Sequence, residues 1–182
     1  MSALTEPSAG GGVIASAEER LTRAVPLILR LSVGFLWLQN AGWKVPPDFG
    51  REAGRGLFAF TAAAVEYPVF SPFSWIVEQV VLPNFVIFGW AVLILEASLG
   101  AFLLVGLATR FWALVGVGQS VAIGLSVAYA PHEWPWSYVL MVLANLAIFA
   151  MAAGRTFGLD GVLRPIWQRS RSRLAEALEL AS

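Results

Sequence analysis

The chain has 182 residues, 58% of them hydrophobic and 13% charged, and its formal net charge at pH 7 is zero. A mean hydropathy of +0.70 lies outside the range of soluble domains and is typical of a protein that crosses a membrane several times. The absence of cysteine excludes disulfides, thiolate catalysis and iron–sulfur ligation, and the single histidine, His132, excludes a bis-histidine haem. The zero net charge argues against a nucleic-acid partner. We therefore expect no metal, haem, disulfide or nucleic acid.

Four apolar runs in the sequence approach or exceed the roughly 20 residues that a helix needs to cross a bilayer. They cover residues 24–43, 85–108, 111–130 and 136–153. These runs predict an all-α membrane protein in which residues 24–154 form a four-helix transmembrane bundle. Residues 1–23 open with a stretch rich in serine, alanine and glycine, and we expect them to be a disordered N-terminal segment on the cytoplasmic side.

Two long segments lie outside these runs, at residues 45–84 and 155–182. Prolines punctuate residues 45–84, and the apolar stretches 56–65 and 74–82 within it are shorter than a span. We expect this segment to form an extracytoplasmic cap that lies on the membrane surface or dips into it. Residues 155–182 place apolar side chains beside arginines and are predicted to form a basic amphipathic cytoplasmic tail on the anionic inner leaflet.

The distribution of positive residues predicts how the chain is oriented in the membrane. With four spans, the N-terminal segment, the turn near residue 110 and the C-terminal segment share one side of the bilayer. That side carries Arg20, Arg23, Arg110, Arg155, Arg164, Arg169, Arg171 and Arg173. The other side carries only Lys44, Arg51 and Arg55. Because positive residues are enriched on the cytoplasmic side, both termini are expected in the cytoplasm.

Each of the four runs contains a polar side chain near its middle. Glu96 is central in the second run, Gln119 in the third and Asn145 in the fourth. Arg30 lies about 5 Å from the centre of the first run at 1.5 Å per residue, a distance that an arginine side chain can cover. A carboxylate at mid-membrane costs about 2.5–3.5 kcal/mol, so it persists where it is paired, neutral or useful. We predict that Arg30 and Glu96 face each other in the bundle.

This polar layer has two interpretations. In the first, it is a small site for a proton or a quinone-like headgroup, in which Glu96 and Arg30 are catalytic and Gln119, Asn145 and Trp90 contact the ligand. In the second, Arg30 and Glu96 are a structural ion pair, and the two amides are interhelical contacts that contribute about 0.6 kcal/mol each. The residues alone leave both interpretations open.

Two further features are the outer-loop pair at residues 132 and 133 and a series of small residues. His132 and Glu133, in the predicted outer loop between the third and fourth runs, form either a proton site at the outer face or a solvated pair. Gly116 is the first of a series of small residues at every fourth position of the third run, and Gly100 follows Glu96 by one turn. These small residues predict close approach of neighbouring helices.

The sequence resembles the DoxX/DoxD family of four-helix membrane proteins at five places in the family's order. The first run contains Arg-Leu-Ser-Val-Gly at 30–34 and Gln-Asn-Ala-Gly-Trp-Lys at 39–44. The second contains Glu-Ala-Ser-Leu-Gly at 96–100, followed by Gly-Leu-Ala-Thr-Arg at 106–110. The last run ends in Gly-Arg-Thr-Phe-Gly-Leu-Asp at 154–160. The long segment 45–84 is more similar to DoxD, the small subunit of thiosulfate:quinone oxidoreductase, than to the compact DoxX form.

This resemblance implies a subunit of an oxidoreductase complex in the bacterial inner membrane that passes electrons to quinone. It also implies a quinone ligand and at least one partner subunit, and a homo-oligomer is compatible with it. A chain without cysteine holds no thiol relay of its own, so a partner must contribute to any thiosulfate chemistry. The competing expectation is a non-catalytic scaffold that anchors a partner protein through its outer loop or its basic tail.

Overall fold

The computed structural model describes residues 9–170 and 172–182, and their regular secondary structure is entirely helical. The prediction of an all-helical chain is therefore confirmed. The helices are α1 (Ala9–Gly42), α2 (Gly56–Glu66), α3 (Ser71–Ile76), η1 (Val77–Val81, a π-helix), α4 (Phe85–Val105), α5 (Thr109–Val127), α6 (Pro135–Met151), η2 (Ala153–Arg155, a 3-10 helix), α7 (Leu159–Arg169) and α8 (Arg173–Ala181).

Within the part of the chain that the structure describes, three helical segments are long and apolar enough to cross a membrane: Arg20–Gly42 of α1, α4 and α5. Helix α6 is also apolar, but its 17 residues extend for only about 25 Å at 1.5 Å per residue. The hydrocarbon core of a bilayer is about 30 Å thick. The structure thus gives a membrane protein with three candidate spans, and the fourth span stays a prediction.

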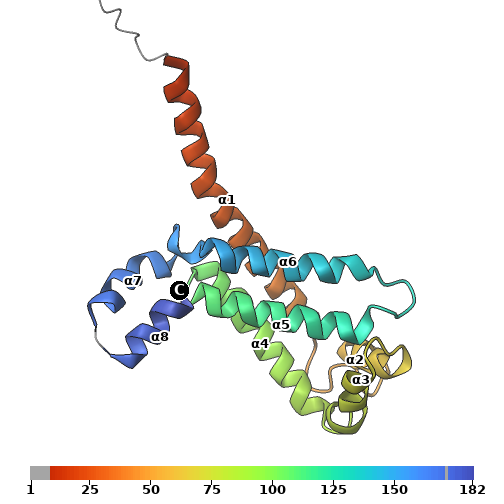
Figure 1. Ribbon diagram of the computed structural model, residues 1–182. Helices are drawn as coiled ribbons and strands as arrows, with labels where there is room; N and C mark the ends of the chain where they lie inside the picture. Colours follow the sequence, from red (N-terminus) through yellow and green to blue (C-terminus); the bar gives the residue numbers. More distant parts are fainter. Residues whose placement is uncertain (1–8, 171) are drawn as a thin grey trace, which may run out of the picture.

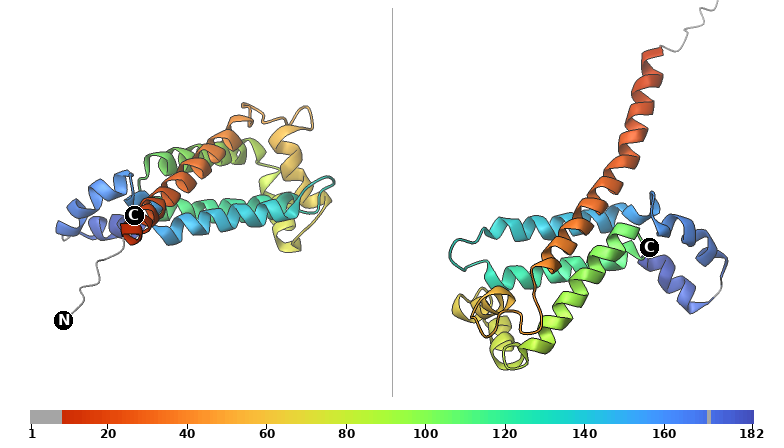
Figure 2. Two further views of the ribbon diagram at one scale, coloured as in Figure 1. Left: turned by 90° about the horizontal axis from the view of Figure 1, so that it is seen from above. Right: turned by 180° about the vertical axis from the view of Figure 1, so that it is seen from behind.

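The four long helices form two antiparallel pairs. Helix α1 packs mainly against α4, and α5 packs mainly against α6. The two pairs cross at an angle (Figure 1). Helices α2 and α3 gather where α1 ends and α4 begins, which we call the α2 end, and helices α7 and α8 lie beyond the opposite ends of α4 and α5, which we call the α7 end (Figure 2).

Glycines allow both pairs to pack closely. A Cβ atom on Gly100 of α4 would lie 2.7 Å from the Leu38 side chain of α1, and one on Gly34 would lie 3.1 Å from the Gly100 carbonyl oxygen. A Cβ atom on Gly116 of α5 would overlap the Asn145 amide of α6. The prediction that Gly100 and Gly116 permit close helix approach is confirmed.

The N-terminal part of the chain differs from its prediction. Helix α1 begins at Ala9, so residues 9–23, which we expected to be disordered, are helical. Composition explains the part nearest the apolar run, because the alanines, glutamates and arginine at 15–20 favour a helix. The first eight residues of the predicted disordered segment lie outside the described residues.

The segment 45–84 contains α2, α3 and η1, and it packs against the start of α4. The Phe49 ring is buried and occupies the space that a side chain at Gly89 would need. Phe58 of α2 contacts Phe85 edge-on, with ring centroids 5.1 Å apart. These aromatic contacts fix the segment over the helices at the α2 end, which is the arrangement that a cap requires.

The described residues of the predicted amphipathic C-terminal tail contain the helices α7 and α8. Helices α7 and α8 pack against each other, and the Arg164 guanidinium donates to the Glu179 carboxylate at 2.9 Å. Ser170 ends α7 in an extended conformation, and the Ser172 hydroxyl accepts a hydrogen bond from the Ala175 amide at the start of α8. Serine at this position is a strong helix N-cap, so it starts a second helix.

Candidate functional site

Glu96 of α4 is fully buried and both of its carboxylate oxygens have partners. One oxygen accepts from the Lys44 ammonium at 2.5 Å, and the other accepts from the Gln119 amide of α5 at 2.9 Å. The charge partner of Glu96 is therefore Lys44. Our prediction that Glu96 faces Arg30 was wrong.

Lys44 reaches Glu96 because its side chain turns back toward α4 from just beyond the end of α1. The Lys44 backbone amide donates to the Ala41 carbonyl at 3.1 Å, and its ammonium also donates to the Asn40 carbonyl at 2.7 Å. The ammonium lies 4.3 Å from the centre of the Trp43 ring, within cation–π range. Burial lowers the pKa of Lys44, and the charge and hydrogen bond of Glu96 oppose that shift.

Arg30 lies at the α7 end, away from Glu96. Its guanidinium donates to the carbonyl oxygens of Leu103 and Leu104 at 2.5 and 2.7 Å and to that of Phe157 at 3.1 Å. The last carbonyls of a helix have no partner within it and carry the negative end of its dipole. The end of α4 therefore provides acceptors for a buried guanidinium, and this explains why Arg30 does not need Glu96.

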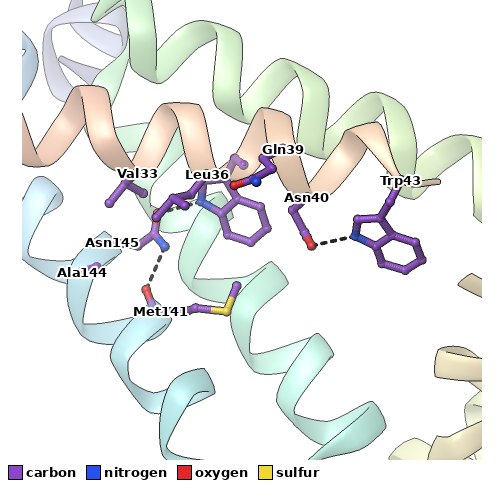
Figure 3. Close-up of a pocket in the computed structure, with 9 residues that line it drawn as sticks. Val33, Leu36, Gln39, Asn40, Trp43, Met141, Ala144 and Asn145 are labelled. Carbon is purple, nitrogen blue, oxygen red and sulfur yellow. Dashed lines mark hydrogen bonds between the residues drawn. The ribbon is translucent and has the colours of Figure 1, made fainter. Parts of the chain in front are cut away.

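The structure also separates Asn145 from the Glu96 cluster. The Asn145 amide oxygen accepts from the Trp37 indole at 3.4 Å, and its nitrogen donates to the Met141 carbonyl at 2.8 Å (Figure 3). Gln119 does join Glu96. The polar layer expected from the sequence is thus three separate groups: Glu96 with Lys44 and Gln119, Asn145 with Trp37, and Arg30 at the α7 end.

A cavity of about 410 Å³ lies over the Lys44–Glu96 pair, and we call it the inner cavity. The cap segment contributes Leu57, Phe60 and Phe73, among other residues, to its lining. Its polar lining residues are Asn40, Lys44, Thr61, Glu96, Gln119, Ser126 and Tyr138, and the remainder of its lining is mostly aliphatic or aromatic. Ligand sites in proteins are typically concave and mostly apolar, with a few converging polar groups and a volume of about 300–1,000 Å³. The inner cavity has these properties.

The other predicted site residues lie outside the inner cavity. Trp90 is exposed and contacts Phe49 edge-on, with ring centroids 5.6 Å apart. His132 is exposed in the loop between α5 and α6. Glu133 of this loop accepts a hydrogen bond from the Tyr138 hydroxyl, so it contacts a residue that lines the cavity.

A second cavity, of about 460 Å³, lies between α1 and α6, and we call it the α1–α6 groove (Figure 3). It is lined by Val33, Leu36, Trp37, Gln39, Asn40, Trp43, Met141, Ala144 and Asn145. Asn40, Trp43 and Met141 line both cavities.

A comparison with protein families matches residues 25–178 to the family described as TQO small subunit DoxD. The chain belongs to the DoxD family. The matched range contains the Lys44–Glu96 pair, the cap and both cavities of this DoxD protein. Comparisons with curated proteins and with solved structures gave no match.

The residue that our sequence analysis missed as a site candidate is Lys44. Two signals pointed to it, because it is the only lysine in the chain and it closes the second of the five family-like motifs. Tyr138, which connects Glu133 with the inner cavity, carried no comparable signal.

Proposed function

We propose that this chain is a membrane subunit of a quinone-linked oxidoreductase and that its inner cavity binds the quinone headgroup. The observation that carries the proposal is a buried ammonium–carboxylate pair that faces an apolar cavity of about 410 Å³. Membership of a family described as the small subunit of TQO, thiosulfate:quinone oxidoreductase, supports it. The description "small subunit" also supports a partner subunit. Because this chain has no cysteine, we assign the supply of electrons to that partner.

The chemistry of quinone reduction fits the groups in the cavity. A quinone takes up two electrons and two protons, and both protons end on its carbonyl oxygens. The Lys44 ammonium has three N–H groups, of which Asn40 and Glu96 accept two. Among the described residues no acceptor is found for the third, so it can donate to a quinone oxygen. We assign Glu96 the role of passing protons through Lys44, and Gln119 the role of holding the carboxylate.

Replacing Glu96 with glutamine tests this assignment. Glutamine keeps the size and the hydrogen-bonding ability of the side chain but does not ionise, so we expect donor-dependent quinone reduction to fall at least about tenfold. The assay is reduction of a soluble quinone in membranes, normalised to the amount of assembled complex. The matched control is Glu78→Gln, an exposed position on η1, which should keep wild-type turnover.

The competing function is a non-catalytic scaffold. A scaffold would give turnover that follows only the amount of assembled complex, whatever the charge at position 96. Wild-type turnover in an assembled Glu96→Gln variant would therefore remove Glu96 from the mechanism. If Glu96→Gln assembles poorly, Gln119→Leu provides a second test, because it leaves the Lys44–Glu96 ion pair in place. A quinone KM that this substitution does not change would count against the proposed site.

We also propose that both termini are cytoplasmic in a bacterial inner membrane. Support comes from the fold, because Arg110 and Arg155 lie at the α7 end and Arg51 and Arg55 lie in the cap segment at the α2 end. Ser172→Cys, at an exposed position in a cysteine-free chain, should not react with an impermeant maleimide added to intact cells. Glu52→Cys in the cap should react. Labelling at position 172 from outside would reverse the topology.

A further inference from the structure

The inner cavity and the α1–α6 groove share three lining residues, Asn40, Trp43 and Met141. Two of these shared residues are hydrogen-bonded to each other, because the Trp43 indole donates to the Asn40 amide oxygen at 3.2 Å (Figure 3). The Trp43 ring also contacts the Lys44 ammonium on the side of the inner cavity. A molecule bound beside Lys44 in the inner cavity therefore lies next to Trp43, which also lines the groove.

The lining of the α1–α6 groove suits a hydrocarbon chain. Val33, Leu36 and Ala144 contribute apolar side chains. The two polar side chains deep in the groove, Trp37 and Asn145, are bonded to each other and, through Asn145, to the Met141 carbonyl. Their polar atoms are satisfied within the protein, so an apolar ligand covers them at little cost.

The groove opens toward the surface of the helices. Leu36 is 57% exposed and Trp43 is 40% exposed, and in a membrane-spanning protein this surface faces lipid or another subunit. The interfaces between α1 and α4 and between α5 and α6 are closed by the close approaches at Gly34, Gly100 and Gly116. Among the described helices, α1 and α6 contact each other less than either contacts its antiparallel partner, which leaves room between them.

We infer that the α1–α6 groove binds the isoprenoid tail of the quinone whose headgroup occupies the inner cavity. This inference rests on the proposed function. From Val33 to Trp43 the groove follows α1 for about 15 Å, at 1.5 Å per residue, toward the level of Lys44. The quinone enters from the lipid between α1 and α6, its ring passes Asn40 and Trp43 to reach the ion pair, and its tail stays in the groove.

Because this chain has no native cysteine, an introduced cysteine is its single alkylation site, and this allows a direct test by blocking the groove. Leu36→Cys is alkylated with benzyl maleimide in membranes that contain the assembled complex. The KM for a long-tailed quinone is expected to rise about tenfold, equivalent to about 1.4 kcal/mol, and the KM for a tail-less soluble quinone is expected to stay within about twofold. The matched control is alkylated Phe35→Cys, which is 61% exposed beside Leu36 but does not line the groove, and which should change neither KM.

A second measurement does not depend on turnover. A quinone with a photoreactive group at the end of its tail should crosslink to α1 and α6, and an excess of long-tailed quinone should prevent this. Crosslinks confined to other helices, or equal effects of alkylation at position 36 on both quinones, would overturn the inference and leave the proposed function intact. Displacement of a bound phospholipid with unchanged quinone kinetics would make the groove a lipid site instead. If the complex neither binds nor reduces either quinone, the proposed function fails and the inference fails with it.

Discussion

Replacing Lys44 with methionine is expected to destabilise the protein by about 3–5 kcal/mol, because it leaves the Glu96 carboxylate buried without its counter-charge. Glu96 is 0% exposed and Lys44 is 4% exposed, so the carboxylate has little contact with water that could compensate for the lost ammonium. Methionine keeps the length and apolar volume of the lysine stem, and this limits the effect to the charge and its hydrogen bonds. Thermal unfolding in a mild detergent, followed by circular dichroism, measures the loss.

The double variant Lys44→Met with Glu96→Gln isolates the pair. We expect it to be more stable than Lys44→Met alone, since glutamine leaves no unpaired charge beside methionine and keeps its contact with Gln119. The control is Arg164→Met in α7, whose ion pair with Glu179 is partly exposed and should contribute less than about 1 kcal/mol. Strictly additive losses in the double variant would show that Lys44 and Glu96 do not interact.

The membrane-spanning core of this fold was predictable because length and apolarity alone decide it. Residues 85–108 and 111–130 are continuous apolar runs, and the structure has α4 and α5 there. The start of α1 was not predictable by the same rule. Residues 9–23 include four charged residues and three glycines, so hydropathy alone starts the helix near residue 24. The helix in the structure begins earlier, at Ala9.

The partners of the intramembrane charges depended on information that the sequence does not display. Counting along each apolar run predicts that Arg30 lies at nearly the depth of Glu96 and that Lys44 lies outside the membrane. Counting residues ignores the length of the side chain. The long Lys44 side chain turns back toward α4, so its ammonium reaches the Glu96 carboxylate. The acceptors of Arg30 are carbonyl groups, whose availability depends on where α4 ends beside α1.

The inner cavity was beyond prediction for a different reason. Glu96 and Gln119 can be recognised in the sequence because they are polar residues in apolar runs. The wall that Leu57, Phe60 and Phe73 provide exists only because α2 and α3 pack over the ends of the long helices. Their apolar composition predicted a segment that lies on the membrane surface or dips into it, and it did not indicate that these side chains line a cavity.

A second large effect is expected at Asp160, a residue of α7 that holds the start of α5. Its carboxylate is fully buried and accepts from the backbone amides of Ala108 and Thr109 at 2.7 and 2.9 Å. The Asp160 backbone amide in turn donates to the Gly106 carbonyl at 2.8 Å. Asp160 thus acts as an N-cap supplied by another helix, in the position where the helix dipole favours a negative charge.

Asp160→Ala should therefore cost about 3–5 kcal/mol, because it leaves two amides of the α4–α5 turn without an acceptor and removes a charge that attracts the buried Arg30 guanidinium. Asp160→Asn should lose less, since one amide oxygen still accepts a hydrogen bond. Glu176→Ala, at an exposed position in α8, is the control and should change stability by less than about 0.5 kcal/mol.

Hydrogen exchange distinguishes this local role from general destabilisation. In Asp160→Ala, exchange should rise first in the peptide that covers residues 106–112, and before the helix pair α5 and α6 shows any change. Unchanged exchange in that peptide would mean that the α4–α5 turn is held without Asp160. Arg30 and its three carbonyl acceptors would then be the contact that joins α1, α4 and the start of the tail.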